Sequence, residues 1–263
     1  MEITFPQKPI PQAEFVALRN YFIKSADYSV IDEDGPLILE GKKLAPSLTT
    51  RQIFAIRSSV MKNKIINRFG YLARISEKAA RGYSDGKSII ELSTAFDFSP
   101  IHLFRAIMES EGKNLDNLAG RDAEQYDLAV KNDMAASDKE HETAKRAEDA
   151  ERRFVEHVRS FGVEMKTQEQ LVQEQIKSAG RAKLTPDILF TRPILVNGEY
   201  ANWLEFKNYV GAPIGFISKS NAKQAKKYYK AYGPGAICYS GSFVSGHKIK
   251  HARLLDVSSI FSQ

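Results

Sequence analysis

Apolar residues recur at helical spacing through the first 120 residues of the chain. Residues 14–24 and 47–67 each carry apolar side chains three or four positions apart, which is the period of one face of a helix. Residues 32–36 form a polar, turn-rich break between these stretches. We therefore expect a helical domain over residues 1–120.

The most specific pattern in this region spans residues 88–111. It predicts a helix over 88–95, a short turn, and a second helix over 99–111 that begins at Ser99 and Pro100, because proline lacks the N–H that is unpaired at a helix start. One set of side chains should face a shared core: Leu92, Ala95, Leu103 and Ile107. Another should point outward: Ile101, His102 and Arg105. This pattern is typical of a helix-turn-helix, which makes His102 and Arg105 candidate DNA contacts; an ordinary helical hairpin is the alternative.

A charged, alanine-rich stretch follows and carries only a thin apolar stripe. Such a composition is typical of a solvated helix and not of an active site. We expect residues 121–146 to form a helical connector.

From about residue 154 the pattern changes to short β-prone runs, so we expect a mixed α/β domain over residues 147–263. Apolar runs at 188–190 and 194–196 precede Asn197-Gly198, and a third run over 200–207 follows it. Asn-Gly between such runs is a strong signal for a hairpin. A helix over about 218–232 and strands near 236–240 and 252–257 complete the prediction. The predicted fold class is therefore α+β/α/β, with the helical domain first.

Composition narrows the class of protein. The hydrophobic fraction of 43% supports a packed core. No run of about 18 apolar residues occurs, and the first residues lack the pattern of a secretory signal. The single cysteine, Cys238, excludes an internal disulfide, and the five histidines lack zinc-ligand spacing. We expect an intracellular protein of the nucleus or cytoplasm, with no membrane partner and no zinc.

The formal net charge of +6 is unevenly distributed. Residues 1–120 carry 16 basic and 14 acidic side chains (+2), residues 121–154 carry 7 and 10 (−3), and residues 155–263 carry 15 and 8 (+7). The excess lies in the α/β domain, where a polyanionic partner and a charge that serves solubility alone both stay open.

The candidate chemistry lies at Pro186-Asp187 and at Glu205-Phe206-Lys207. Because side chains alternate along a strand, Glu205 and Lys207 should share one face while Phe206 points into a core. Asp187 and Glu205 at one point would form an oxygen-only cation site suited to Mg²⁺, or to Mn²⁺ in its place. Lys207 beside it could stabilise negative charge on a phosphate. Together these residues predict metal-assisted hydrolysis of a phosphodiester.

One geometric condition must hold for this site. A two-residue turn at Asn197-Gly198 pairs positions that sum to 395, which by strict alternation puts Asp187 on the face of Phe206. A bulge of one residue would restore the parity, and Pro193 marks its place because proline cannot donate to a strand ladder. We therefore expect an irregularity over residues 191–193.

Two neighbouring helices supply further candidates. Glu151 on the preceding helix is a third carboxylate, although Glu148 and Glu156 lie one or two turns away on the same helix. Gln224 and Tyr228 lie one turn apart on the following helix, so Gln224 could point into the site.

The helix that carries Gln224 also has a lysine face and no acidic residue. At about 100° per residue its lysines fall within an arc of about 100°. These five residues, Lys219, Lys223, Lys226, Lys227 and Lys230, are candidate phosphate contacts. The core-facing set should be Ala225, Tyr228, Tyr229 and Tyr232.

These motifs resemble the TPD-motif family, the group of the codanin-interacting nuclease within the PD-(D/E)XK restriction-endonuclease-like nucleases. The resemblance rests on four stretches: Leu184-Thr-Pro-Asp-Ile, Trp203-Leu-Glu-Phe-Lys, Gln224-x-x-x-Tyr228 and Tyr232-Gly-Pro-Gly-Ala-Ile-Cys-Tyr239. It covers residues 147–245 and extends more loosely to 92–108, which resembles the family's helix-turn-helix.

The resemblance implies a restriction-endonuclease-like core with a mixed central sheet flanked by helices. It implies Mg²⁺-dependent cleavage of nucleic acid, DNA in the first instance, and a codanin-type protein partner. Asp187, Glu205 and Glu151 would be metal ligands, Lys207 the water-positioning lysine and Gln224 an auxiliary site residue. Two alternatives stay open: a catalytically inactive nuclease fold that binds DNA or acts as a scaffold, and a processor of RNA or of structured junctions.

Overall fold

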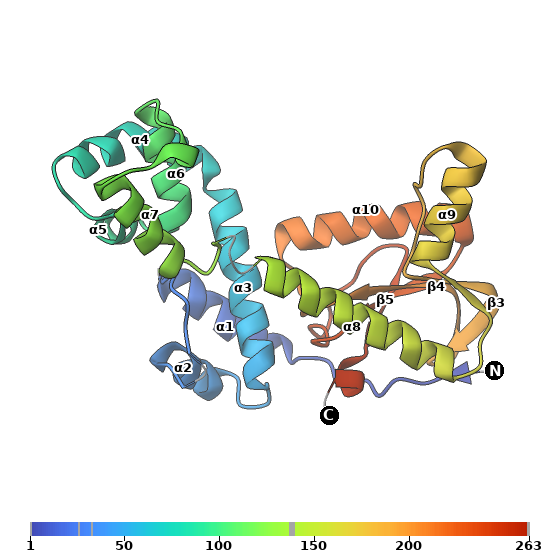
Figure 1. The fold of residues 1–263 in the computed structure, drawn as a ribbon. Coiled ribbons are helices and arrows are strands. Elements are labelled where there is room, and N and C mark those ends of the chain that lie inside the picture. Colours follow the sequence, from blue (N-terminus) through green and yellow to red (C-terminus); the bar gives the residue numbers. More distant parts are fainter. Residues whose placement is uncertain (1, 26, 33, 137–139, 262–263) are drawn as a thin grey trace. The chain divides into compact units, whose positions relative to one another are not determined.

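The computed structural model describes residues 2–25, 27–32, 34–136 and 140–261 (Figure 1). The chain divides into two compact units, Met1–Phe15 with Ala144–Gln263 and Val16–Thr143. The start of the chain therefore groups with the C-terminal unit and not with the expected helical domain. Backbone hydrogen bonds explain this, because the N–H of Ile10 donates to the Phe243 carbonyl at 2.8 Å and the N–H of Ser245 donates to that of Ile10.

The second unit is helical, as the apolar spacing predicts. Its helices are α1 (Gln12–Ser25), which begins in the other unit, α2 (Pro36–Leu44), α3 (Thr50–Asn67), α4 (Phe69–Ser84), α5 (Ile89–Phe96), α6 (Pro100–Ser110) and α7 (Arg121–Lys131), with a short 3₁₀ turn at Leu115–Asn117. Helix α3 begins at Thr49, whose side chain accepts from the N–H of Gln52 in a capping box. Helix α7 packs into the same core as α5 and α6, so residues 121–131 are not the solvated connector that we expected. Residues 137–139 of that connector lie outside the described residues.

Helices α5 and α6 form the expected helix-turn-helix pair, joined by a turn in which Asp97 is left-handed (φ 48°). Leu92, Leu103 and Ile107 are buried as predicted. The prediction was wrong for Ala95, which is exposed, and for Ile101, which is 1% exposed. Ile101 belongs to the helical core, against which Met134 and Ala135 of the segment after α7 also pack.

The start of α6 differs from the expected cap. Ser99 occupies the cap position, but its hydroxyl accepts no N–H of its own helix and instead donates to the Asp133 carboxylate. Asp133 is fully buried and satisfies an amide of the first turn from a distant point in the sequence. The cap of α6 is therefore a tertiary contact.

The C-terminal unit is built on a six-stranded mixed sheet (Figure 1). Its strands are β1 (Glu2–Ile3), β2 (Met165–Thr167), β3 (Ile188–Val196), β4 (Glu199–Lys207), β5 (Gly235–Tyr239) and β6 (Arg253–Asp256). The order is β1-β3-β4-β5-β6, with β2 paired to β3 off this path. The β3–β4 and β2–β3 pairs are antiparallel, and the others are parallel.

Helices pack against both faces of this sheet. Helix α8 (Glu140–Ser160) contributes Phe154 and Val158 to the core on the side of Leu204 and Phe206. Helix α10 (Gly215–Tyr232) contributes Ala225 and Tyr228 to a second core around Trp203. Helix α9 (Gln168–Ala179) follows β2, and a 3₁₀ turn at Ser258–Phe261 follows β6. Strands β1 and β2 and helices α2, α4 and α9 are elements that the sequence pattern did not reveal.

The hairpin and its irregularity are both present. Asn197 and Gly198 have positive φ values of 49° and 78°, as a type I′ turn requires. Pairs near the turn sum to 395 (Ile194 with Ala201), but pairs beyond it sum to 392 (Ile188 with Leu204). The shift lies between Leu189 and Ile194, so the expected irregularity at 191–193 is confirmed, although it amounts to three residues and not one. Because three is odd, the parity of the strand still reverses.

The close approach of Trp203 to Gly235 generates a stability prediction. The two residues pair across β4 and β5, and a Cβ added at Gly235 would lie 2.2 Å from Cε2 of the indole, which is fully buried. Gly235→Ala should lower the free energy of unfolding by about 1–3 kcal/mol, as expected for overpacking a filled core. Chemical denaturation measures the change.

A helix glycine provides the matched control for that experiment. A Cβ at Gly70 in α4 meets no atom within 4 Å, so Gly70→Ala should leave stability unchanged or slightly raised. Equal stability of the Gly235→Ala variant and the parent chain would contradict the packing described here.

Candidate active site

The irregular hairpin places the two predicted acids next to one another. Asp187 directly precedes β3, and the register of Ile188 with Leu204 continues to Asp187 opposite Glu205. The N–H of Phe206 donates to Asp187 Oδ2 at 2.6 Å, which fixes that carboxylate against β4. Asp187 and Glu205 are each only 4% exposed. The fold thus buries two carboxylates at the end of one strand pair.

Glu205 holds the other predicted residues. Its Oε1 accepts from Lys207 Nζ at 2.6 Å and from Gln224 Nε2 at 2.7 Å. Gln224 Nε2 also lies 3.2 Å from the hydroxyl of Tyr228, one turn further along α10. Glu205 and Lys207 therefore share a strand face, and Gln224 reaches them from the neighbouring helix, as the sequence predicts.

The second oxygen of Glu205 is unusual. Glu205 Oε2 is buried and has no hydrogen-bond partner among the residues that the structure describes. A buried carboxylate oxygen without a partner loses its hydration and receives nothing in return. The hydrogen-bonding capacity of this oxygen is therefore unused among the described residues.

The charges of the cluster act on one another. Burial, followed by the charges of Glu205 and Glu151, raises the pKa of Asp187 well above its ordinary value. Burial and then Glu205 also raise the pKa of Glu151. Burial alone would lower the pKa of Lys207, but the charge and hydrogen bond of Glu205 outweigh it and raise that pKa. Repulsion among three carboxylates is thus only partly offset by one lysine.

A cavity of about 470 Å³ opens beside these acids. It lies between α8 and the start of α9, and its acidic lining residues are Glu148, Glu151, Glu156, Glu169 and Asp187. The predicted helix carboxylate, Glu151, is distinguished from Glu148 and Glu156 because its charge acts on Asp187. Sequence reasoning missed Glu169, whose charge also raises the pKa of Glu151. No local signal marks Glu169, since only the packing of α9 brings it there.

The lysine face of α10 is present at the surface. All five predicted lysines are exposed, while Ala225 and Tyr228 are buried. Tyr229 was predicted to face the core, and this was wrong, because it is 45% exposed. The core around Trp203 receives only the side of α10 that carries Ala225 and Tyr228, so Tyr229 falls at its margin.

The two remaining candidates, His102 and Arg105, lie on α6 in the helical unit. Arg105 is exposed, but His102 is half-buried, with its Nδ1 2.8 Å from the Ser99 hydroxyl and its ring against Phe69. Burial lowers the pKa of His102, against the opposing charge of Asp133. His102 therefore serves the start of α6, and Arg105 is the exposed basic side chain of the pair.

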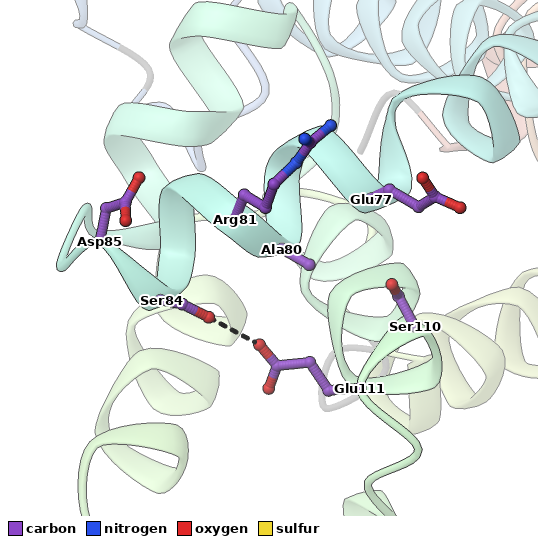
Figure 2. Close-up of a pocket in the computed structure, with 7 residues that line it drawn as sticks. All are labelled: Glu77, Ala80, Arg81, Ser84, Asp85, Ser110 and Glu111. Carbon is purple, nitrogen blue, oxygen red and sulfur yellow. Dashed lines mark hydrogen bonds between the residues drawn. The ribbon is translucent and has the colours of Figure 1, made fainter.

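A second hollow lies in the helical unit between α4 and α6 (Figure 2). Its volume is about 530 Å³, and Figure 2 shows Ser84 pointing toward Glu111, to which it donates at 3.2 Å. None of the predicted site residues lines it. The predicted catalytic residues all lie in the C-terminal unit.

Two general features of the described residues complete the picture. Within the described ranges, no group of three or more His, Cys, Asp or Glu side chains is arranged to hold a metal ion. In the same ranges, no helix combines the length and apolar character needed to cross a membrane. The cluster itself is made of Asp187, Glu205, Lys207 and Gln224, and the charge of Glu151 acts on it from α8.

Comparison with known proteins identifies the family. A family model described as "Protein of unknown function TPD sequence-motif" matches residues 119–257, which include the whole cluster. An uncharacterized protein of Acanthamoeba polyphaga mimivirus is 36% identical over 108 residues, which cover 40% of this chain and 38% of the viral protein. The chain thus spans less than two thirds of the length of that relative. No solved structure matches. Because the family match covers more than half of the sequence, the chain belongs to the TPD sequence-motif family.

Proposed function

We propose that the C-terminal unit is a Mg²⁺-dependent nuclease with a restriction-endonuclease-like core, which hydrolyses phosphodiester bonds in nucleic acid, DNA in the first instance. The observation that carries this proposal is the buried pair Asp187 and Glu205 with Lys207 bonded to Glu205. Burying two acids side by side is unfavourable unless a positive charge joins them. Lys207 offsets only one of the two negative charges.

The residues present fit a hard divalent cation. The donor set is carboxylate oxygen, which Mg²⁺ and Mn²⁺ prefer. Glu205 Oε2 is buried and without a partner in the described part of the chain, so it is free to act as a ligand. Asp187 and Glu205 would hold the ion, and Glu151 would contribute from α8. When bound, the ion would supply Lewis-acid stabilisation of the charge that develops on the phosphate.

The remaining residues have separate tasks. Lys207 Nζ would orient the attacking water and stabilise negative charge at the phosphate, since its raised pKa keeps it protonated. Gln224 Nε2 holds Glu205 Oε1 in place and thereby fixes which oxygen stays open. The Tyr228 hydroxyl beneath it stays neutral, because burial and the Glu205 charge raise its pKa.

The lysine face of α10 would bind the phosphate backbone. All five of its lysines are exposed, and the helix has no acid in its first turn and none elsewhere in its sequence. Arg105 would add a contact from the helix-turn-helix. The codanin-type protein partner and the nuclear or cytoplasmic location stay predictions of the family resemblance.

Substitutions in the buried cluster test the reaction. Asp187→Asn, Glu205→Gln and Lys207→Met should each reduce Mg²⁺-dependent cleavage at least about 100-fold, because each removes a group that acts on the developing charge. Cleavage of labelled duplex, single-stranded, flap and junction DNA and of RNA measures the effect. Glu199→Gln is the matched control, since Glu199 is 69% exposed at the far end of β4.

The same experiment separates the alternatives. Undiminished cleavage by all three cluster variants would exclude this site as the catalytic centre. Nucleic-acid binding without cleavage of any substrate would favour the inactive, DNA-binding or scaffolding protein. Cleavage restricted to RNA or junctions would favour the processing enzyme.

Thermal unfolding tests the metal without relying on activity. In EDTA, Asp187→Asn should raise the melting temperature by about 2–4 °C, the shift that corresponds to about 1 kcal/mol in a domain of 150–250 residues, because it removes one of the repelling charges. The amide oxygen can still accept from the N–H of Phe206. Added Mg²⁺ should stabilise the parent chain and not this variant. Equal responses to Mg²⁺ would show that Asp187 is not a ligand.

Charge reversal tests the lysine face. Lys226→Glu with Lys230→Glu should weaken DNA binding and reduce the slope of log K against log salt by about 0.9 for each phosphate that the protein no longer neutralises. Lys177→Glu on α9, another exposed lysine of this unit, is the control and should have a smaller effect. A salt slope unchanged by the double reversal would place the backbone-binding surface elsewhere.

A further inference from the structure

An exposed aromatic side chain lies at the margin of the lysine face. Tyr229 is 45% exposed, although its neighbour Tyr228 is buried in the core around Trp203. Its ring contacts that of His251 with centroids 5.0 Å apart and planes at 39°. Two aromatic rings at the surface, from elements 22 residues apart in the sequence, form a small platform.

The backbone of His251 is held in an uncommon conformation. His251 has φ 74°, in the left-handed region that residues other than glycine rarely adopt. Such positions are strained and tend to be kept where they orient a functional side chain. Here the conformation brings the imidazole against Tyr229. Ile249 and Ala252 on either side pack against the core and hold this turn in place.

The stretch of sequence that carries both rings is strongly basic. Residues 206–255 contain no Asp or Glu and nine basic residues: Lys207, Lys219, Lys223, Lys226, Lys227, Lys230, Lys248, Lys250 and Arg253. Lys250, next to His251, is exposed, as are Lys226 and Lys230, which flank Tyr229 on α10. A polyanion is therefore the ligand that this charge distribution favours.

Helix geometry relates the platform to the active site. At about 100° per residue, Gln224 lies about 60° from Lys227 at one edge of the lysine arc, and Tyr229 lies about 60° from Lys226 at the other. Gln224 contacts Glu205. Gln224, which contacts the cluster, and Tyr229 thus border the lysine face on its two opposite sides.

We propose that Tyr229 and His251 stack on a base of an unpaired nucleic-acid strand whose phosphates lie along the lysine face of α10. The inference rests on the proposed nucleic-acid function and names its substrate class, a single-stranded segment. A basic surface interleaved with aromatic rings is the usual way to bind such strands, because every base has a face that can stack and only an unpaired base exposes it. A paired base in a duplex does not present that face.

Binding without cleavage is the direct test. Full-length protein in EDTA is titrated with labelled oligothymidine, oligouridine and a blunt DNA duplex, and fluorescence anisotropy gives each Kd. Tyr229→Ala should weaken binding to the single strands about tenfold, the order expected when one base no longer stacks on an aromatic ring. Binding to the duplex should stay within about twofold, while Tyr229→Phe, which keeps the ring, should bind as the parent chain does.

Two further variants test whether the effect is specific to the ring at position 229. Tyr200→Ala removes a tyrosine that is 62% exposed on β4 of the same unit, and should change nothing. Tyr229→Trp places an indole at the platform, and its fluorescence should be quenched when either oligonucleotide binds. A Tyr229→Ala effect on oligothymidine alone, or on oligouridine alone, would assign the site to DNA or to RNA.

The outcomes that overturn the inference differ from those that overturn the nuclease. Parent-like binding of single strands by Tyr229→Ala, or equal weakening on the duplex, would reject the platform even if the protein cleaves DNA. Tyr229-dependent binding without any Asp187-dependent cleavage would reject the nuclease and keep the platform. Absence of binding to both single strands would reject the platform, and the Mg²⁺-dependent cleavage assay would decide the nuclease separately.

Discussion

The burial of Asp187 beside Glu205 is the constraint on which the rest of the C-terminal unit depends. Each carboxylate is 4% exposed, so their repulsion is not relieved by water. The N–H of Phe206, the ammonium of Lys207 and the amide of Gln224 each donate to this pair. These contacts tie β3, β4 and α10 to one point. The second oxygen of Glu205, Oε2, is buried and has no hydrogen-bond partner among the described residues.

The three-residue register shift in β3 is what makes that pairing possible. Without it, the Asn197-Gly198 turn would put Asp187 on the opposite face from Glu205. Helix α8 packs on one side of the resulting sheet through Phe154, and α10 packs on the other through Tyr228. The irregularity in β3 therefore orients the Asp187 side chain toward Glu205, a task that loops perform in many other sites. The hydrophobic cores on both faces of the sheet remain packed.

Aspartates also organise the helical unit, by a different means. Asp133 caps α6 through the N–H of Ile101 and the hydroxyl of Ser99, and Asp97 receives Lys64 and Arg68 at the turn before it. Each carboxylate replaces a local cap or turn contact with one from a distant residue. The helix-turn-helix is thus fixed by its surroundings, and its exposed face is narrower than the sequence indicates, since Ile101 belongs to the core.

The sequence by itself determined the features that depend on residues close together along the chain. Apolar spacing indicated helices α1, α3, α5, α6 and α10, Asn197-Gly198 indicated the hairpin, and strand alternation put Glu205 and Lys207 on one face. The parity argument required a shift by an odd number of residues, and Pro193 indicated its place, although not its size of three residues. Tertiary structure alone decided which side chains are buried and which distant segments lie together. It buried Ile101 in the helical core, exposed Tyr229 beside the core around Trp203, brought Glu169 to Glu151 and added β1 to the sheet. These contacts join residues far apart in sequence, and no local pattern encodes which distant surface a side chain will meet.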